Sequence, residues 1–135
     1  NKILYLSNSK NDEGKNKERT MQISELLEKQ RELDQFIIKN RYDYPEYIDA
    51  NDKSFLRDRI LALSVEVGEF ANATRCFKYW SNKPSESKER LLDEYADILH
   101  FMLSVANTIG FTAKEIEQAY MKKHEVNYKR QVEGY

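Results

Sequence analysis

The chain has 135 residues, of which 40% are hydrophobic and 33% are charged, and its formal net charge is -1 at pH 7. That length suits one domain, and the near-zero charge argues against a nucleic-acid polymer or a membrane surface as partner. Its single cysteine, Cys76, excludes an intrachain disulfide and favours a reducing, cytoplasmic setting. No apolar run approaches the roughly 18 residues that a transmembrane helix needs, and no signal peptide is recognisable.

Residues 1–20 are expected to form an N-terminal arm outside the main domain, which spans residues 21–135. The arm begins with the short apolar run KILYL and continues with SNSKNDEGKNKERT, which has no hydrophobic period. We therefore predict a flexible segment, or one that docks on a partner subunit through KILYL.

The remainder of the chain has the apolar spacing of four helices. The first covers residues 21–40, and the second begins at the N-cap Asp52 and continues to about residue 79. The third covers residues 87–108 and ends before Gly110, the predicted C-cap. The fourth begins with the capping box TAKE, residues 112–115, and continues to about residue 131. Only 4 Gly and 2 Pro occur in the chain, which favours helices over a sheet-rich fold, whose turns need more of both. The predicted fold is all-α, a bundle of four to five helices.

Two pairs of acidic residues lie within the apolar stripes of the second and third helices. Glu66 and Glu69 are three residues apart, as are Glu94 and Asp97, so each pair shares one helical face. If the two helices pack antiparallel, four carboxylates meet at one end of their interface. Partly buried like charges need compensation, and oxygen-only ligands suit Mg²⁺ or Mn²⁺. The alternative is that these acids form ordinary ion pairs on exposed faces.

The ordered motifs EVGEFANATRCFKYWS, LLDEYADILHF and KHEVNYKRQVEGY resemble those of the all-α nucleoside triphosphate pyrophosphatases. Within that group the chain is most similar to the dimeric-type dUTPases, especially their short bacterial and phage branch. The resemblance implies a homodimer that hydrolyses dUTP, with residues from both subunits able to complete one site.

The last helix carries the residue types that bind a triphosphate. Lys123, Asn127 and Arg130 share one face, where the two cations can bind phosphate oxygens. The resemblance implies that these three residues and Tyr135 bind the phosphates and the sugar. The alternative is a basic helix C-terminus that complements the helix dipole.

The resemblance also indicates where the base is recognised. Gln30 stands where the related enzymes have a glutamine that reads the edge of uracil, and an amide has the donors and acceptors for this task. Asp34 stands where some members carry Asn, and because an ionised Asp only accepts hydrogen bonds, sugar or water binding is a further role for it. Trp80 is expected to stack on the base and Lys78 to reach phosphate, whereas core packing is the alternative for Trp80.

Three further residues close to these motifs in sequence are not assigned to the chemistry alone. Phe77 is assigned equally to base stacking and to core packing. His100 lies in the apolar stripe of the third helix and is expected to be a core histidine with its hydrogen bonds satisfied. Cys76 is expected to be a small buried side chain.

The acidic pairs thus predict a Mg²⁺-dependent enzyme, and the resemblance implies that it converts dUTP to dUMP and pyrophosphate. Glu66, Glu69, Glu94 and Asp97 would hold the metal, and Glu66 is the candidate general base. One alternative is a MazG-like pyrophosphohydrolase for another nucleotide, which shares the acidic motifs. A more distant one is a helical interaction module without activity, whose acids are structural.

Overall fold

The computed structural model describes residues 19–41 and 50–134, and their regular structure is helical throughout. The elements are α1 (Ile23–Asn40), a 3₁₀ turn η1 (Lys53–Phe55), α2 (Leu56–Thr74), α3 (Lys88–Ile109) and α4 (Ala113–Glu133). The all-α prediction is confirmed. The predicted KILYL docking segment and Tyr135 lie outside the described residues.

Polar side chains cap η1, α3 and α4, and the caps at Asp52 and Thr112 are the predicted ones. Asp52 accepts a hydrogen bond from the backbone N of Ser54 at 2.9 Å, at the start of η1. Ser87 caps α3, and Thr112 and Glu115 form the complete capping box of α4. Gly110 ends α3 with φ 94°, a left-handed conformation that glycine adopts without steric cost.

The second helix ends at Thr74, five residues before the predicted position near Tyr79. Arg75 adopts the left-handed conformation, φ 59° and ψ 12°, and its N–H donates to the carbonyls of Ala71 and Asn72. Its guanidinium then donates to the backbone O of Lys83 and, at 2.9 Å, to Oγ of Ser81. The prediction was wrong because hydrophobic period alone does not reveal a left-handed arginine cap.

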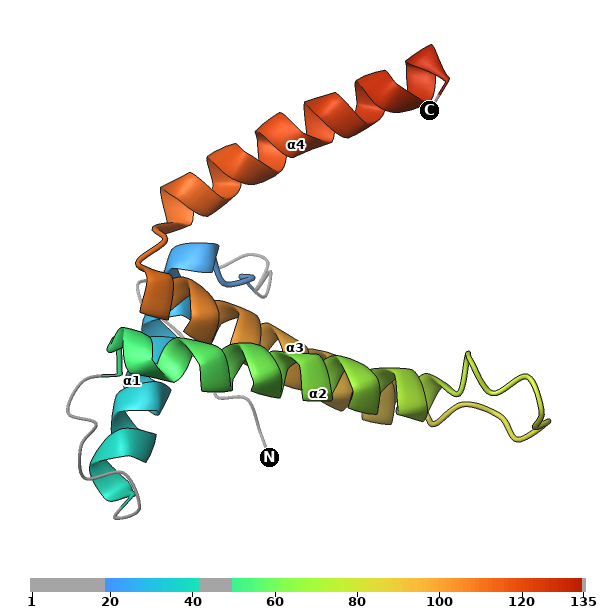
Figure 1. Cartoon of the computed structure of the whole chain (residues 1–135), viewed down its shortest axis with the longest axis horizontal. Coiled ribbons are helices and arrows are strands. Elements are labelled where there is room, and N and C mark those ends of the chain that lie inside the picture. The colour runs from blue at the N-terminus through green and yellow to red at the C-terminus, as the bar shows by residue number, and fades with distance from the viewer. Residues whose placement is uncertain (1–18, 42–49, 135) are drawn as a thin grey trace, which may run out of the picture.

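The helices α2 and α3 lie side by side and antiparallel, and α1 crosses α3 near the C-terminal end of α3 (Figure 1). The helix α4 turns away after Gly110 and extends from the other helices. Among the described elements, α4 contacts only α1. One chain therefore presents three packed helices and a projecting fourth.

Few apolar side chains are buried within one chain. Leu27, Ala50 and Ala106 are the buried hydrophobic residues of the described part. Many residues of the predicted apolar stripes remain exposed, among them Phe36, which is 65% exposed. Their helical period was correct, but the described residues leave much of the surface that they form exposed. No helix in the described residues is long and apolar enough to cross a membrane.

Candidate metal and nucleotide site

The antiparallel pairing of α2 and α3 brings acids from both helices together. Carboxylate oxygens of Glu66 on α2 and of Glu94 and Asp97 on α3 lie within 4.8 Å of one another. Glu66 lies in the C-terminal half of α2, and the other two lie in the N-terminal half of α3. The three-residue spacing of the acids on α3 directs both toward α2.

Glu66 is the electrostatic centre of the group. Burial raises the pKa of its carboxyl above the ordinary value, and a hydrogen bond with Glu69 raises it further. The negative charges of Glu69, Asp97 and Glu94 act in the same direction. The structure thus groups three of the four predicted metal ligands, whereas Glu69 is exposed and lies outside this group, and acts on the pKa of Glu66 from the same helix.

Glu94 is the most deeply placed of the acids, with 7% of its surface exposed. Its Oε1 accepts a hydrogen bond from Arg90, one turn earlier on α3. Its Oε2 is buried without a hydrogen-bond partner among the described residues, and so is Oε2 of Glu66. Unpartnered buried carboxylate oxygens are costly, and hard divalent cations take such oxygens as ligands. The donor set therefore fits Mg²⁺ or Mn²⁺.

The predicted base-reading residues lie at the contact of α1 with α3. Gln30 and Asp34 are 5% and 8% exposed, and Nε2 of Gln30 donates to Oδ1 of Asp34 at 3.0 Å. Nδ1 of His100 lies 2.6 Å from Oε1 of Gln30. His100 follows Asp97 by three residues on α3, so the contact between Gln30 and His100 lies about one helical turn along α3 from that acid. The expectation of a core histidine was wrong in its burial, because His100 is exposed, but its ring has a partner.

A buried arginine, which the sequence interpretation missed, completes this network. Arg59 on α2 is 7% exposed, donates to Oγ1 of Thr108 and to the backbone O of Ala50, and lies 3.8 Å from Oδ2 of Asp34. Oγ of Ser104 also donates to Oδ2 of Asp34, at 2.7 Å. Its place beside the site could have been inferred from the sequence, because Arg59 precedes Glu66 by seven residues and therefore shares its face of the helix.

The aromatic segment after α2 lies in turns, not in the helix. The Trp80 ring contacts the rings of Phe77 and Tyr79 edge to face, at centroid distances of 6.1 and 5.1 Å. Trp80 is 64% and Phe77 50% exposed, so neither is a core residue. Nζ of Lys78 lies 5.7 Å from the Phe77 ring centroid. Cys76 is exposed, which corrects the expectation of a buried thiol, because the helix has already ended at Thr74.

The predicted phosphate-binding residues Lys123, Asn127 and Arg130 are exposed on α4. Since α4 contacts only α1 among the described elements, one chain does not bring them to the acids of α2 and α3 (Figure 1). The three lie along one side of α4, as their spacing predicts.

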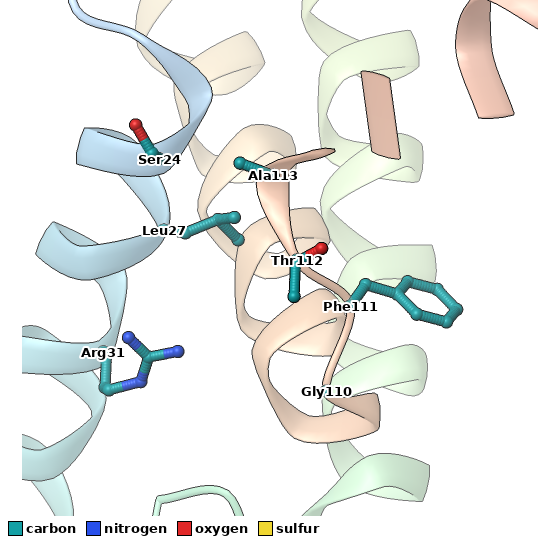
Figure 2. Close-up of a pocket in the computed structure, with 7 residues that line it drawn as sticks. All are labelled: Ser24, Leu27, Arg31, Gly110, Phe111, Thr112 and Ala113. Carbon is teal, nitrogen blue, oxygen red and sulfur yellow. The ribbon is translucent and has the colours of Figure 1, made fainter. Parts of the chain in front are cut away.

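A cavity of about 270 Å³ lies elsewhere, between α1 and the junction of α3 with α4 (Figure 2). At this place Nη2 of Arg31 donates to Oδ1 of Asn107 at 3.1 Å. The cavity contains none of the predicted site residues and is lined by Ser24, Leu27, Arg31, Gly110, Phe111, Thr112 and Ala113.

Comparison with known proteins shows the family of the chain. A dCTP pyrophosphatase of Enterobacteria phage T4 is 28% identical over an alignment of 99 residues, which covers 62% of this chain. The match spans 58% of that relative, little more than half of its length. No solved structure matches the chain. The model of a family described as dUTPase matches residues 22–110 and 102–135. Since these residues include all four helices, the chain belongs to this dUTPase family.

Proposed function

We propose that the protein is a Mg²⁺-dependent dUTP diphosphatase, which hydrolyses dUTP to dUMP and pyrophosphate. The observation that carries the proposal is the group Glu66, Glu94 and Asp97, with two buried carboxylate oxygens that lack a partner among the described residues. Membership of the dUTPase family supports the same chemistry.

The four acids would hold the metal, with Mn²⁺ as an alternative to Mg²⁺. When bound, such a cation supplies neutralisation of triphosphate charge and activation of water. Glu66 is our candidate for the general base, because it lies between Glu69 on its own helix and the two acids of α3. Lys123, Asn127, Arg130 and Tyr135 would bind the phosphates and sugar, and Lys78 would add a further cation.

Gln30 is proposed to read the base. One N–H of its amide donates to Asp34, and one lone pair of its amide oxygen faces Nδ1 of His100. One N–H and one lone pair remain, which match O4 and N3–H of uracil. Asp34 therefore orients Gln30 and does not need to contact the base. The exposed Trp80 is proposed to stack on the base from the turn after α2.

A MazG-like activity on another nucleotide is the second candidate, and dCTP is the substrate that an observation favours. The phage relative is named a dCTP pyrophosphatase, and an amide recognises a cytosine edge when its donor and acceptor sides are exchanged. The orientation that Asp34 imposes on Gln30 is what would decide between the two bases.

We further propose that the enzyme is a cytoplasmic homodimer. The exposed apolar stripes support association of identical chains. The partner of the chain is then a small-molecule nucleotide together with a second copy, and nothing in the charge of the protein calls for nucleic acid.

The test is pyrophosphate release from dUTP, dCTP, dTTP, dATP and UTP, with Mg²⁺ and with EDTA. Preference for dUTP that EDTA abolishes is the expected result. Preference for dCTP would keep the acidic site and reverse the assignment of Gln30. No turnover of any nucleotide by the wild type, and no effect of Glu69→Gln on the metal-induced change in Tm, would leave a non-enzymatic interaction module.

A further inference from the structure

The side-chain amide of Gln30 is fixed in one orientation. The carboxylate of Asp34 accepts a hydrogen bond from Oγ of Ser104 at 2.7 Å and lies 3.8 Å from the guanidinium of Arg59, so donors surround it. A carboxylate in this setting accepts hydrogen bonds and donates none. The atom of Gln30 that faces it at 3.0 Å is therefore Nε2, which carries the hydrogens. The amide oxygen of Gln30 is consequently turned away from Asp34 and toward α3.

That oxygen decides which nitrogen of the His100 imidazole carries the hydrogen. Nδ1 of His100 lies 2.6 Å from Oε1 of Gln30. An amide oxygen can only accept, so the hydrogen of this bond belongs to Nδ1. In the neutral ring the second nitrogen, Nε2, then carries a lone pair and no hydrogen. The buried groups behind Gln30 thus make Nε2 of His100 a hydrogen-bond acceptor.

Nε2 of His100 faces away from the buried network. The two ring nitrogens point in nearly opposite directions, and Nδ1 is directed at Gln30, which is 5% exposed. His100 itself is exposed, and Nε2 has no hydrogen-bond partner among the described residues. Within this part of the chain the ring is held at one edge and open at the other. A donor group of a ligand can therefore reach Nε2 without displacing a contact.

The position of His100 on α3 indicates which part of a nucleotide supplies this donor. His100 follows Asp97, a member of the acidic group, by three residues, or about 4.5 Å along the helix. It also contacts Gln30, the proposed reader of the base. In a nucleotide the sugar joins the base to the phosphates, so a residue between the metal ligands and the base reader lies beside the sugar. A 2′-deoxyribose has one hydroxyl there, the 3′-hydroxyl, and its O–H can donate.

We propose that Nε2 of His100 accepts a hydrogen bond from the 3′-hydroxyl of the bound nucleotide, and that the enzyme therefore selects nucleotides whose 3′-hydroxyl is free. His100 is then a specificity residue and takes no part in the cleavage step. The contact with the sugar rests on the proposed function, whereas the position of the hydrogen on Nδ1 does not. Because this hydrogen is set by Gln30 and Asp34, one chain of hydrogen bonds links recognition of the base to recognition of the sugar.

Nitrogen NMR of the protein labelled in its histidines tests the contact without turnover. The chain has 2 His, and His124→Gln assigns the signals of His100. Above the pH range in which histidine titrates, Nδ1 of His100 should carry the hydrogen. The product dUMP should shift the Nε2 signal toward that of a hydrogen-bonded nitrogen, and 2′,3′-dideoxyuridine monophosphate, which lacks the 3′-hydroxyl, should not. A hydrogen on Nε2, no shift with dUMP, or equal shifts with both nucleotides would overturn the proposal.

Kinetics with dUTP and 2′,3′-dideoxy-UTP measure what the contact contributes to selection. For the wild type, kcat/KM should be about tenfold higher for dUTP, which is the contribution of one hydrogen bond. His100→Phe keeps a ring at an exposed position but has no acceptor, so the ratio should fall to about one through a loss on dUTP alone. His100→Gln provides an amide oxygen near the place of Nε2 and should restore part of the ratio. The same ratio in the wild type and in His100→Phe would contradict the contact.

The two experiments separate the two proposals. A wild type that hydrolyses no nucleotide, but whose Nε2 signal responds to dUMP and not to the dideoxy nucleotide, would refute the proposed function and retain the contact. An active wild type that cleaves dUTP and 2′,3′-dideoxy-UTP equally well would refute the contact and retain the function.

Discussion

Gln30 and Asp34, one turn apart on α1, are joined by a hydrogen bond of 3.0 Å from Nε2 of Gln30 to Oδ1 of Asp34. Because Ser104 donates to the other oxygen of Asp34 at 2.7 Å, the carboxylate is fixed. It can only accept, so it fixes which side of the Gln30 amide carries the donor. If Gln30 reads the base as proposed, the selectivity for the base should therefore depend on Asp34, which sets the orientation of the Gln30 amide.

Asp34→Asn should lower the discrimination between dUTP and dCTP. An asparagine can donate or accept, so the Gln30 amide would no longer be held in one orientation. We expect the ratio of kcat/KM values for the two substrates to change about tenfold, which corresponds to ~1.4 kcal/mol. Glu32→Gln, on the exposed side of α1, is the control. An equal loss of activity on both nucleotides would show that Asp34 contributes only to stability.

Glu66→Gln should stabilise the metal-free protein and abolish turnover. The change removes a partly buried charge that lies beside three other acids, and relief of such repulsion is worth about 0.5–2 kcal/mol. Thermal unfolding in EDTA measures the gain, and pyrophosphate release measures the loss. Asp93→Asn, next to Glu94 in sequence but exposed, should not raise Tm. A lower Tm for the Glu66 variant would contradict the repulsion.

The pH dependence of stability follows from the direction of the Glu66 shift. Its pKa is raised above the ordinary value of 4.5 in the folded state, so the destabilisation is absent below 4.5 and complete above the raised pKa. In EDTA, Tm should therefore fall as pH rises through this window. The gain in Tm on adding Mg²⁺ should grow over the same window, because the cation takes the ionised carboxylates. Glu66→Gln should flatten both trends.

Arg90→Gln should weaken the metal-free protein and increase its response to metal. Arg90 supplies the cation that neutralises the buried Glu94, and loss of one partner leaves a buried charge uncompensated. Tm in EDTA should fall by several degrees, and the Mg²⁺-induced rise should exceed that of the wild type. Arg57→Gln, whose partner is Asp58 in an exposed pair, should change neither value measurably. An unchanged Mg²⁺ response would show that Arg90 does not compete with the metal.

Arg59→Met should cause a large loss of stability. The guanidinium holds the chain at Ala50, the end of α3 at Thr108, and Asp34 on α1. Removal leaves a buried Asp34 without its cation, and breaking such a pair costs about 3–5 kcal/mol. Urea unfolding measures the effect. A second change, Asp34→Leu in the same chain, should recover part of the loss, because it removes the orphaned charge.

The helices could be predicted from the sequence because apolar period and capping residues act locally. The capping box at Thr112 and the C-cap at Gly110 are where the residue types place them. The end of α2 could not be predicted, because an arginine in the left-handed conformation has no compositional signal. The direction of α4 could not be predicted either, because spacing along the chain does not encode the angle between successive helices.

In the candidate site, helical spacing predicted which acids share a face, and antiparallel pairing brought them together. The buried links of Arg59 and Ser104 to Asp34 were not predicted. They join residues on three helices, and no spacing along the chain encodes such a contact. Spacing likewise grouped Lys123, Asn127 and Arg130 on one side of α4, but it could not predict that α4 extends away from the acids of α2 and α3.

The conformation of Arg75 links the end of α2 to the shape of the loop that follows it, two properties that are usually independent. A non-glycine residue with positive φ costs about 1–2 kcal/mol, and here the same side chain returns hydrogen bonds to Lys83 and Ser81 in the loop that it starts. Glycine would remove the backbone strain but also the hydrogen bonds to Lys83 and Ser81. Another residue would lose these hydrogen bonds and keep the strain. The length of α2 and the position of the Trp80 turn are thus set together, by one side chain.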